Sequence, residues 1–315
     1  AIGLAAVNII RPGDGVNITG ASAAVGNDLA QSHVTLTGVL VHVVPQSFFE
    51  AAANNEVLQI VFFSVLFGVA LARTSREKKL TMLAFCESLS EIMFKLTDLV
   101  MKFAPFGIGA AIAVTVGTSG LGVLRHLGVL ILTLYAALVV FIVAVLIPVA
   151  LLARIPIVKF WRAVKQPWLI AFSTASSEAA LPRAFEAMEE FGVPRRIVAF
   201  VLPTGYSFNL DGSTLYLAVA SVFVAQAAGI DMSLKSQLFM MVTLMLTSKG
   251  VAAVPRASLV ILSGALSQFG LPLEGVAVIL GVDAVMDMAR TSINLVGNCL
   301  ATAVMDRWET VRGER

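Results

Sequence analysis

The chain has 315 residues, of which 58% are hydrophobic and only 13% charged, and its mean hydropathy is +0.89. Soluble domains carry about 25% charged residues, and a chain this apolar would leave too much hydrophobic surface exposed in water. The composition therefore excludes an ordinary soluble protein and predicts a membrane protein whose main partner is the lipid bilayer. The long apolar segments described below predict that this membrane protein is all-α. The formal net charge of +2 is too small and too dispersed to indicate a nucleic-acid partner.

The first apolar segment is short. Residues 1–10 are apolar and are followed by Arg11-Pro12-Gly13, whereas a membrane span needs about 20 apolar residues. We expect residues 1–12 to be the end of a transmembrane helix, with the helices that precede it missing from this chain. Residues 13–56 are the most polar part and predict an extramembrane loop with a short amphipathic segment from Pro45 to Asn55.

Three longer apolar segments follow, at 57–72, 80–116 and 127–152. The second carries charges mostly three or four residues apart, so they share one helical face. That face is expected to lie along headgroups or an aqueous cleft, with the span itself over about 99–116. Basic clusters follow the first and third segments, two crossings apart, and the positive-inside rule places both in the cytoplasm.

The C-terminal half consists of interrupted apolar segments. Segment 167–181 is too short to cross and is polar in its middle, and segment 238–269 is interrupted at 247–250 and 254–256. Segment 197–228 is broken at Pro203-Thr204-Gly205 and at Asn209-Leu210-Asp211-Gly212. Broken helices persist in a membrane only inside protein or beside water. Two helical hairpins, each followed by a polar-interrupted helix, are typical of inverted-repeat secondary transporters.

The last helix, predicted over 276–304, carries the most informative residues. Asp283, Asp287, Arg290, Asn294 and Asn298 are three or four apart and share one helical face. Ionisable residues within a membrane helix are costly and mark functional sites. One interpretation is a self-neutralising Asp287–Arg290 pair that only packs the helix. The other is a solute site, where the guanidinium binds a carboxylate and Asp287 binds an amine.

A site with both charges suits an acidic amino acid, because a plain dicarboxylate would leave Asp287 facing only negative charge. The Asn209–Gly212 break offers Asp211 and freed carbonyls to a hard cation, or is an ordinary helix kink. Ser176, Ser177 and Ser258 lie at the hairpin tips beside helix N-termini, which attract anions such as an α-carboxylate.

Three motifs together carry a family resemblance. They are Ser176-Ser177 ahead of Leu181-Pro182, Asn-Leu-Asp-Gly-Ser at 209–213, and Asp283-x3-Asp287-x2-Arg290-x3-Asn294. Over essentially the whole chain they resemble the dicarboxylate/amino-acid:cation symporter family of glutamate transporters. Members of this family are among the transporters that define the inverted-repeat pattern, so that pattern is not independent support.

The resemblance implies an elevator-type homotrimer, multi-pass in the bacterial inner membrane, with re-entrant hairpins at about 166–182 and 238–269. It assigns residues 1–12 to the end of a transport-domain helix and 13–120 to an extracellular loop and scaffold or trimerisation helices. Residues 121–315 would form the transport domain that binds the substrate.

The resemblance also implies roles for single residues. Arg290 would hold the substrate's side-chain carboxylate, which Ser213 would also contact, and Asp287 would hold its amino group. Asn294 and Ser177 would bind the main-chain end, and the tip from Val254 to Ser258 would close over the substrate. Ser176 and Thr291 complete the predicted substrate site. Sodium-coupled relatives coordinate cations at the positions of Gly205, Asn209, Asp211 and Asn294.

This chain departs from the sodium-coupled pattern. Asn298 stands where those members have an aspartate, and Lys249 would repel a cation in the outer hairpin. Glu178 adds a titratable carboxylate at the inner tip, where burial disfavours its charged form. We therefore expect proton coupling, with Glu178 as the first candidate carrier and Asp211 as the second. Asp283 belongs to the same predicted coupling group.

Several alternatives stay open. Sodium is the alternative coupling ion, at Asn209, Asp211 and Asn294, and Glu178 could instead pair with Arg256 as a gate. No cofactor is expected beyond the coupling ion. C4-dicarboxylate symport is the alternative within transport. An intramembrane hydrolase is disfavoured, since all three histidines lie outside the broken helices and only a Ser–Lys dyad using Lys249 remains. No catalytic residue is therefore predicted. A channel fits the closing hairpins less well than alternating access does.

Overall fold

The computed structural model describes residues 1–16, 47–53, 57–103, 106, 113, 117, 122–247 and 257–312, and every element in these ranges is a helix. The all-α prediction is confirmed for this part of the chain. Most of the predicted span at 99–116 and the outer tip with Lys249, Val254 and Arg256 lie outside the described residues, as does most of the loop at 13–56.

The helices of the first half are α1 (Ile2–Ile10), α4 (Phe48–Ala53), α5 (Val57–Ala72), α6 (Arg76–Met101), α8 (Gly122–Phe141), the π-helix η1 (Ile142–Leu146) and α9 (Ile147–Leu152). Those of the second half are α10 (Ile157–Thr174), α11 (Ser177–Phe191), α12 (Arg195–Phe208), α13 (Asp211–Ala227), α14 (Leu234–Thr247), α15 (Ala257–Gln268) and α16 (Glu274–Arg312).

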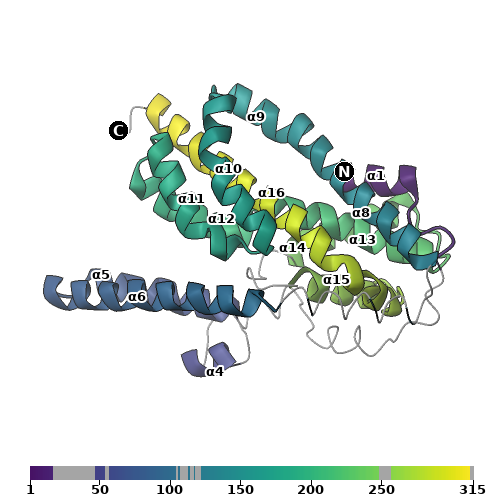
Figure 1. Ribbon diagram of the computed structural model, residues 1–315, viewed down its shortest axis with the longest axis horizontal. Helices are drawn as coiled ribbons and strands as arrows, with labels where there is room; N and C mark the ends of the chain where they lie inside the picture. The colour runs from purple at the N-terminus through teal and green to yellow at the C-terminus, as the bar shows by residue number, and fades with distance from the viewer. Residues whose placement is uncertain are drawn as a thin grey trace.

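Helix α16 runs through the middle of the bundle and contacts α8, α10, α12 and α13 (Figure 1). Two hydrophobic clusters meet along it. The first cluster joins the first half of α16, as far as Ile293, to α1, α8, α13, α14 and α15. The second cluster joins the second half of α16, from Leu295 onward, to the four helices α9, α10, α11 and α12. The polar face of α16 therefore lies where the two clusters meet.

Helices α8, η1 and α9 form one continuous helix with a π-turn in its middle. Pro148 is the second residue after the π-turn, and proline cannot donate the usual helical hydrogen bond and crowds the preceding turn. In the described part of the chain, Leu124–Leu152 and Arg195–Ala227 are long and apolar enough to cross a membrane. They coincide with the predicted spans at 127–152 and 197–228.

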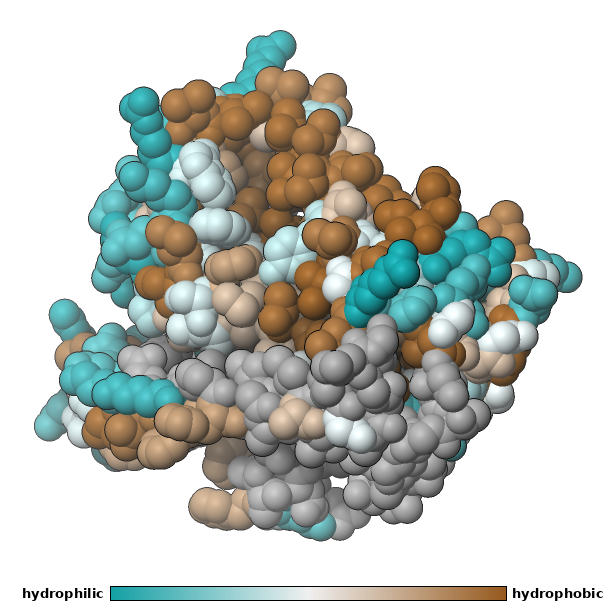
Figure 2. Space-filling model, turned by 45° about the vertical axis from the view of Figure 1, so that its right-hand side comes forward, coloured by the Kyte–Doolittle hydropathy of each residue, from teal (hydrophilic) through white to brown (hydrophobic). Residues whose placement is uncertain are grey.

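The outer face of this bundle is apolar. Leu132, Val139, Val143, Leu152 and Val158 are all more than half exposed, and hydrophobic side chains cover much of the face in Figure 2. Exposed apolar surface of this extent is expected where lipid, and not water, surrounds the protein.

Helices α10 and α11 form a helical hairpin whose tip is Ala175 and Ser176. Its arms run from Ile157 to Phe191, well beyond the predicted 166–182. The outer parts of the arms are amphipathic, because they bury Phe160, Val164 and Met188 and expose charged residues on their other face. An uninterrupted apolar run marks only the middle of such a hairpin, so the predicted boundaries were too narrow.

Helices α12 and α13 are separated by the non-helical residues Asn209 and Leu210, which confirms the break predicted there. The other predicted break, at Pro203-Thr204-Gly205, is wrong because α12 continues through it. Thr204 Oγ1 donates to the Phe200 carbonyl at 2.6 Å, which keeps a carbonyl of this turn bonded next to the proline. α16 also extends about two turns beyond its predicted end at 304.

Candidate functional site

The five polar residues of the α16 face are all buried. Asp283, Asp287, Arg290, Asn294 and Asn298 are at most 9% exposed, and Arg290 is 1% exposed. Their helical spacing of three and four puts them in one row, as the sequence predicted, and the row faces α12 and α13. Water is excluded here, so these groups must satisfy one another or a ligand.

Arg290 is held by two carboxylates of its own helix. Its Nη1 lies 3.0 Å from Asp283 Oδ1 and its Nε lies 2.9 Å from Asp287 Oδ1. Thr291 Oγ1 donates to the same Asp287 oxygen at 2.7 Å. With both carboxylates ionised, Arg290, Asp283 and Asp287 carry a net charge of −1. The Asp287–Arg290 pair is thus formed, but with an additional carboxylate it is not neutral.

Tyr216 completes this cluster, and no motif in the sequence pointed to it. The guanidinium carbon of Arg290 lies 4.0 Å from the centre of the Tyr216 ring, and both side chains are fully buried. Such stacking on an aromatic face stabilises a cation and fixes the plane of the guanidinium. Tyr216 lies in an apolar run of α13, and only the tertiary packing of α13 on α16 shows its role.

Asn294 joins α16 to the beginning of α13. Its Oδ1 accepts from the backbone N–H of Gly212 at 2.7 Å and of Ser213 at 3.3 Å, and its Nδ2 donates to Ser213 Oγ at 3.0 Å. The first amides of a helix have no acceptor within the helix, and inside a membrane they need one from protein. Asn294 therefore supplies that acceptor at the broken helix.

The predicted cation-site residues also meet at this break. Asn209 Nδ2 donates to Asn298 Oδ1 at 3.1 Å, and a Cβ at Gly205 would overlap the Asn298 amide. Asp211 Oδ2 lies 2.6 Å from where a Cβ of Gly297 would stand. The possible ligand atoms gathered here are carboxylate and amide oxygens, which suit a hard cation.

The tip of the α10–α11 hairpin carries Ser176, Ser177 and Glu178. Ser176 is the N-cap of α11, where its Oγ accepts from the Ala179 N–H at 3.2 Å and donates to Glu178 Oε2 at 3.1 Å. Glu178 is close enough to Asp287 for the two charges to interact. Ser177 begins α11, and Ser258 is buried at the start of α15. The inner tip and the α16 cluster are thus neighbours.

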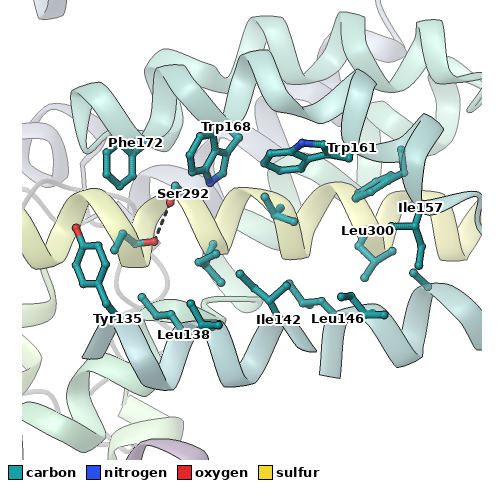
Figure 3. A pocket seen from close by; sticks show the side chains of 17 residues that line it. Tyr135, Leu138, Ile142, Leu146, Ile157, Trp161, Trp168, Phe172, Ser292 and Leu300 are labelled. Carbon is teal, nitrogen blue, oxygen red and sulfur yellow. Dashed lines mark hydrogen bonds between the residues drawn. The ribbon is translucent and has the colours of Figure 1, made fainter. Parts of the chain in front are cut away.

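A separate cavity of about 440 Å³ lies between α8–α9, α10 and α16 (Figure 3). Hydrocarbon and aromatic side chains line it, among them Trp161, Trp168 and Phe172. Its hydroxyl on α16, Ser292, already donates to the Ala289 carbonyl at 2.9 Å. It offers no charged group to a zwitterion, so the polar row around Arg290 is the better candidate for an acidic solute.

Comparison with known proteins gives consistent matches. The model of the sodium:dicarboxylate symporter family matches residues 1–308. A proton/sodium-glutamate symport protein of Bacillus caldotenax is 45% identical over 98% of this chain and 74% of its own length. A proton/glutamate-aspartate symporter of Escherichia coli is 42% identical over 98% of this chain and 72% of its own. A C4-dicarboxylate transport protein of Rhizobium johnstonii is 42% identical over 98% of this chain and 70% of its own.

Proposed function

Because the chain belongs to the sodium:dicarboxylate symporter family, we propose that it is a secondary active symporter that imports glutamate or aspartate together with protons. The observation that carries this proposal is the buried Arg290, paired with Asp283 and Asp287 beside a broken helix and a hairpin tip. Ionisable residues buried in a membrane helix are costly and mark functional sites, so this cluster supports the binding of a charged solute.

In the proposed pose the substrate takes over both ends of an existing ion pair. Its side-chain carboxylate binds the planar fork of Arg290, and its ammonium group binds Asp287, which now accepts from Arg290 and Thr291. Its α-carboxylate lies against Ser177, Asn294 and the N-terminal amides of the hairpin helices. Ser176, Ser213, Ser258 and the loop containing Val254 complete the site.

C4-dicarboxylate symport is the alternative, and the Rhizobium relative favours it by name. Asp287 disfavours it, because a dicarboxylate has no positive group to neutralise this carboxylate in a buried site. Competition between aspartate and succinate for uptake decides between the two.

Proton coupling is proposed with Glu178 as the first candidate carrier and Asp211 as the second. Glu178 is partly buried, bonded to Ser176 and near the charge of Asp287, and both burial and a like charge favour a protonated carboxyl. Sodium at Asn209, Asp211 and Asn294 is the alternative. The pairing of Asn209 with Asn298, an uncharged amide, leaves fewer negative ligands for sodium there.

The architecture proposed for the whole protein is an elevator-type homotrimer, multi-pass in the bacterial inner membrane. Residues 121–315 form the moving transport domain, with α10–α11 and α14–α15 as its re-entrant hairpins, and 1–12 belongs to the same domain. Residues 13–120 form the extracellular loop and the scaffold. The amide network that joins α1 to α13 and α14 through Asn8, Gln226 and Gln237 supports placing residues 1–12 with the transport domain.

Counterflow of labelled aspartate into liposomes that contain the purified protein tests the function. Sodium and proton gradients are imposed separately, with Arg290→Ala as the matched inactive control. We expect uptake driven by an inward proton gradient in sodium-free buffer. Uptake that requires sodium and does not depend on the pH gradient would contradict proton coupling. The absence of any flux of acidic amino acids would contradict the proposed transport function itself.

A further inference from the structure

The cluster around Arg290 contains one more carboxylate than the proposed substrate pose uses. Asp287 is neutralised by the substrate's ammonium group, and Arg290 is neutralised by its side-chain carboxylate. Asp283 remains, with its Oδ1 3.0 Å from Arg290 Nη1 and only 1% of the residue exposed. An ionised Asp283 therefore competes with the substrate for the same guanidinium.

The charge total makes this competition costly. Arg290, Asp283 and Asp287 sum to −1 when both carboxylates are ionised, and an acidic amino acid adds −1 at neutral pH. Two uncompensated negative charges would then share a site from which water is excluded, where each costs several kcal/mol. Removing the charge of Asp283 removes half of that excess and frees one side of the guanidinium.

Asp283 also has an oxygen suited to carrying a proton. Its Oδ2 and the Tyr216 hydroxyl are both buried, and neither has a hydrogen-bond partner among the described residues. The two side chains are nevertheless close enough to interact electrostatically. The Tyr216 hydroxyl can donate to an ionised Oδ2, whereas a protonated Oδ2 is itself a donor and can use the same hydroxyl as its acceptor, so the pair can hold this carboxyl group in either charge state. The charged groups that face the cluster from the described helices are Arg290 and Asp287 on α16 and Glu178 on α11.

We propose that Asp283 is a proton-binding site of the transport cycle, which takes up one proton at Oδ2 as the substrate binds and so releases Arg290 to the substrate's side-chain carboxylate. The proton enters from the aqueous side that supplies the substrate and leaves with it on the other side. This inference rests on the proposed function and adds a second proton site to Glu178. It makes the import of one substrate depend on at least two protons.

The test counts protons taken up when aspartate binds to the purified protein. Titration calorimetry in two sodium-free buffers of different ionisation enthalpy gives this number, and the slope of log Kd against pH gives it independently. Asp283→Asn keeps the size of the side chain and one oxygen for Arg290 but cannot titrate. We expect this variant to take up about one proton fewer than the wild-type protein when aspartate binds. The change in its Kd for aspartate per pH unit should accordingly be about tenfold smaller than in the wild-type protein. Equal proton counts in the two proteins would overturn the proposal.

Two further measurements separate the outcomes. Glu178→Gln should take up about one proton fewer than the wild-type protein, because Glu178 no longer titrates, and the proton at Asp283 should remain. The double variant of Glu178→Gln and Asp283→Asn should therefore take up about two protons fewer. If the wild-type protein binds no acidic amino acid, the proposed function fails; if it binds with a proton count that Asp283→Asn does not change, only this inference fails. If Asp283→Asn does not fold, Tyr216→Phe removes a single hydroxyl and should shift the pH at which the proton is taken up. An unshifted pH profile in Tyr216→Phe would then count against the proposal.

Discussion

At the scale of single residues, Arg290 is confined from three directions, by Asp283, Asp287 and the ring of Tyr216. A guanidinium fixed in this way has already lost its side-chain freedom, so binding a carboxylate costs it little further entropy. The same confinement makes the choice of ligand depend on charge more than on shape. Each partner of Arg290 therefore has a distinct and measurable role.

Asp287→Ser is predicted to change the substrate preference. Aspartate should lose the partner of its ammonium group, whereas succinate should gain from the removal of a negative charge. Truncating one partner of a buried charge pair costs about 2–5 kcal/mol, so the advantage of aspartate should fall about 30-fold or more. The preference is measured by how strongly unlabelled aspartate and unlabelled succinate each inhibit the uptake of labelled substrate. Asp306→Ser on the same helix is the control. An unchanged ratio would contradict the assignment of Asp287.

Gly212→Ala is predicted to destabilise the protein. A Cβ at this position would overlap the backbone of Arg290, where α13 crosses α16, and overpacking of this kind costs about 1–3 kcal/mol. Gly264→Ala is the matched control, because Gly264 lies within α15 with nothing within 4 Å of the added carbon. That change should be neutral or stabilise the helix by up to about 1 kcal/mol. Thermal unfolding of both variants, followed by tryptophan fluorescence, checks the contrast.

At the scale of elements, the hairpin of α10 and α11 depends on one side chain at its tip. Ser176 caps α11 and at the same time binds Glu178. The N-cap hydrogen bond and the Glu178 carboxylate therefore share the Ser176 hydroxyl, so a change in one alters the hydrogen bonding of the other. Proton binding at Glu178 would alter the hydrogen bonding of the cap directly.

Ser176→Ala is predicted to loosen this tip. Loss of an N-cap side chain costs about 1 kcal/mol, so the first amides of α11 should exchange with solvent about fivefold faster or more. Ser173→Ala removes an exposed hydroxyl from the same hairpin, one bonded only to the Ile170 carbonyl, and should leave the exchange unchanged. Hydrogen exchange at residues 177–180 distinguishes the two, and equal rates would show that the cap is dispensable.

The elements also show how far the sequence alone could lead. The row from Asp283 to Asn298 was predictable, because a regular helix fixes which residues share a face. The break at Asn209–Leu210 was predictable from its polar residues and glycine. The full arms of the α10–α11 hairpin were not, since amphipathic helices contain no long apolar run. The contact of Tyr216 with Arg290 and the capping role of Asn294 both depend on how α13 crosses α16. That crossing is tertiary packing, which a single sequence does not specify to the reader.

At the scale of the whole molecule, the basic loops predict its orientation. Residues 73–79 cover the turn between α5 and α6 and the first residues of α6, and residues 154–165 cover the loop between α9 and α10 and the first half of α10. Cysteines introduced at Ser75 and Arg154, in a protein without Cys86, should both react with a membrane-impermeant thiol reagent from the cytoplasmic side only. A cysteine at Asp231, between α13 and α14, should react from the opposite side. Labelling of Ser75 and Arg154 positions from different sides would refute the predicted orientation.

The pairing of Arg290 within its own helix also bears on how the protein is made. A single charged residue at the centre of a helix adds about 2.5–3.5 kcal/mol to the cost of insertion by the translocon. Because Asp287 and Asp283 lie three and seven residues before Arg290 on α16, the nascent helix can neutralise its arginine before α13 or the hairpins arrive. Moving both of these carboxylates to a neighbouring helix could keep the finished geometry, yet it would send the unpaired charge of Arg290 into the bilayer during synthesis.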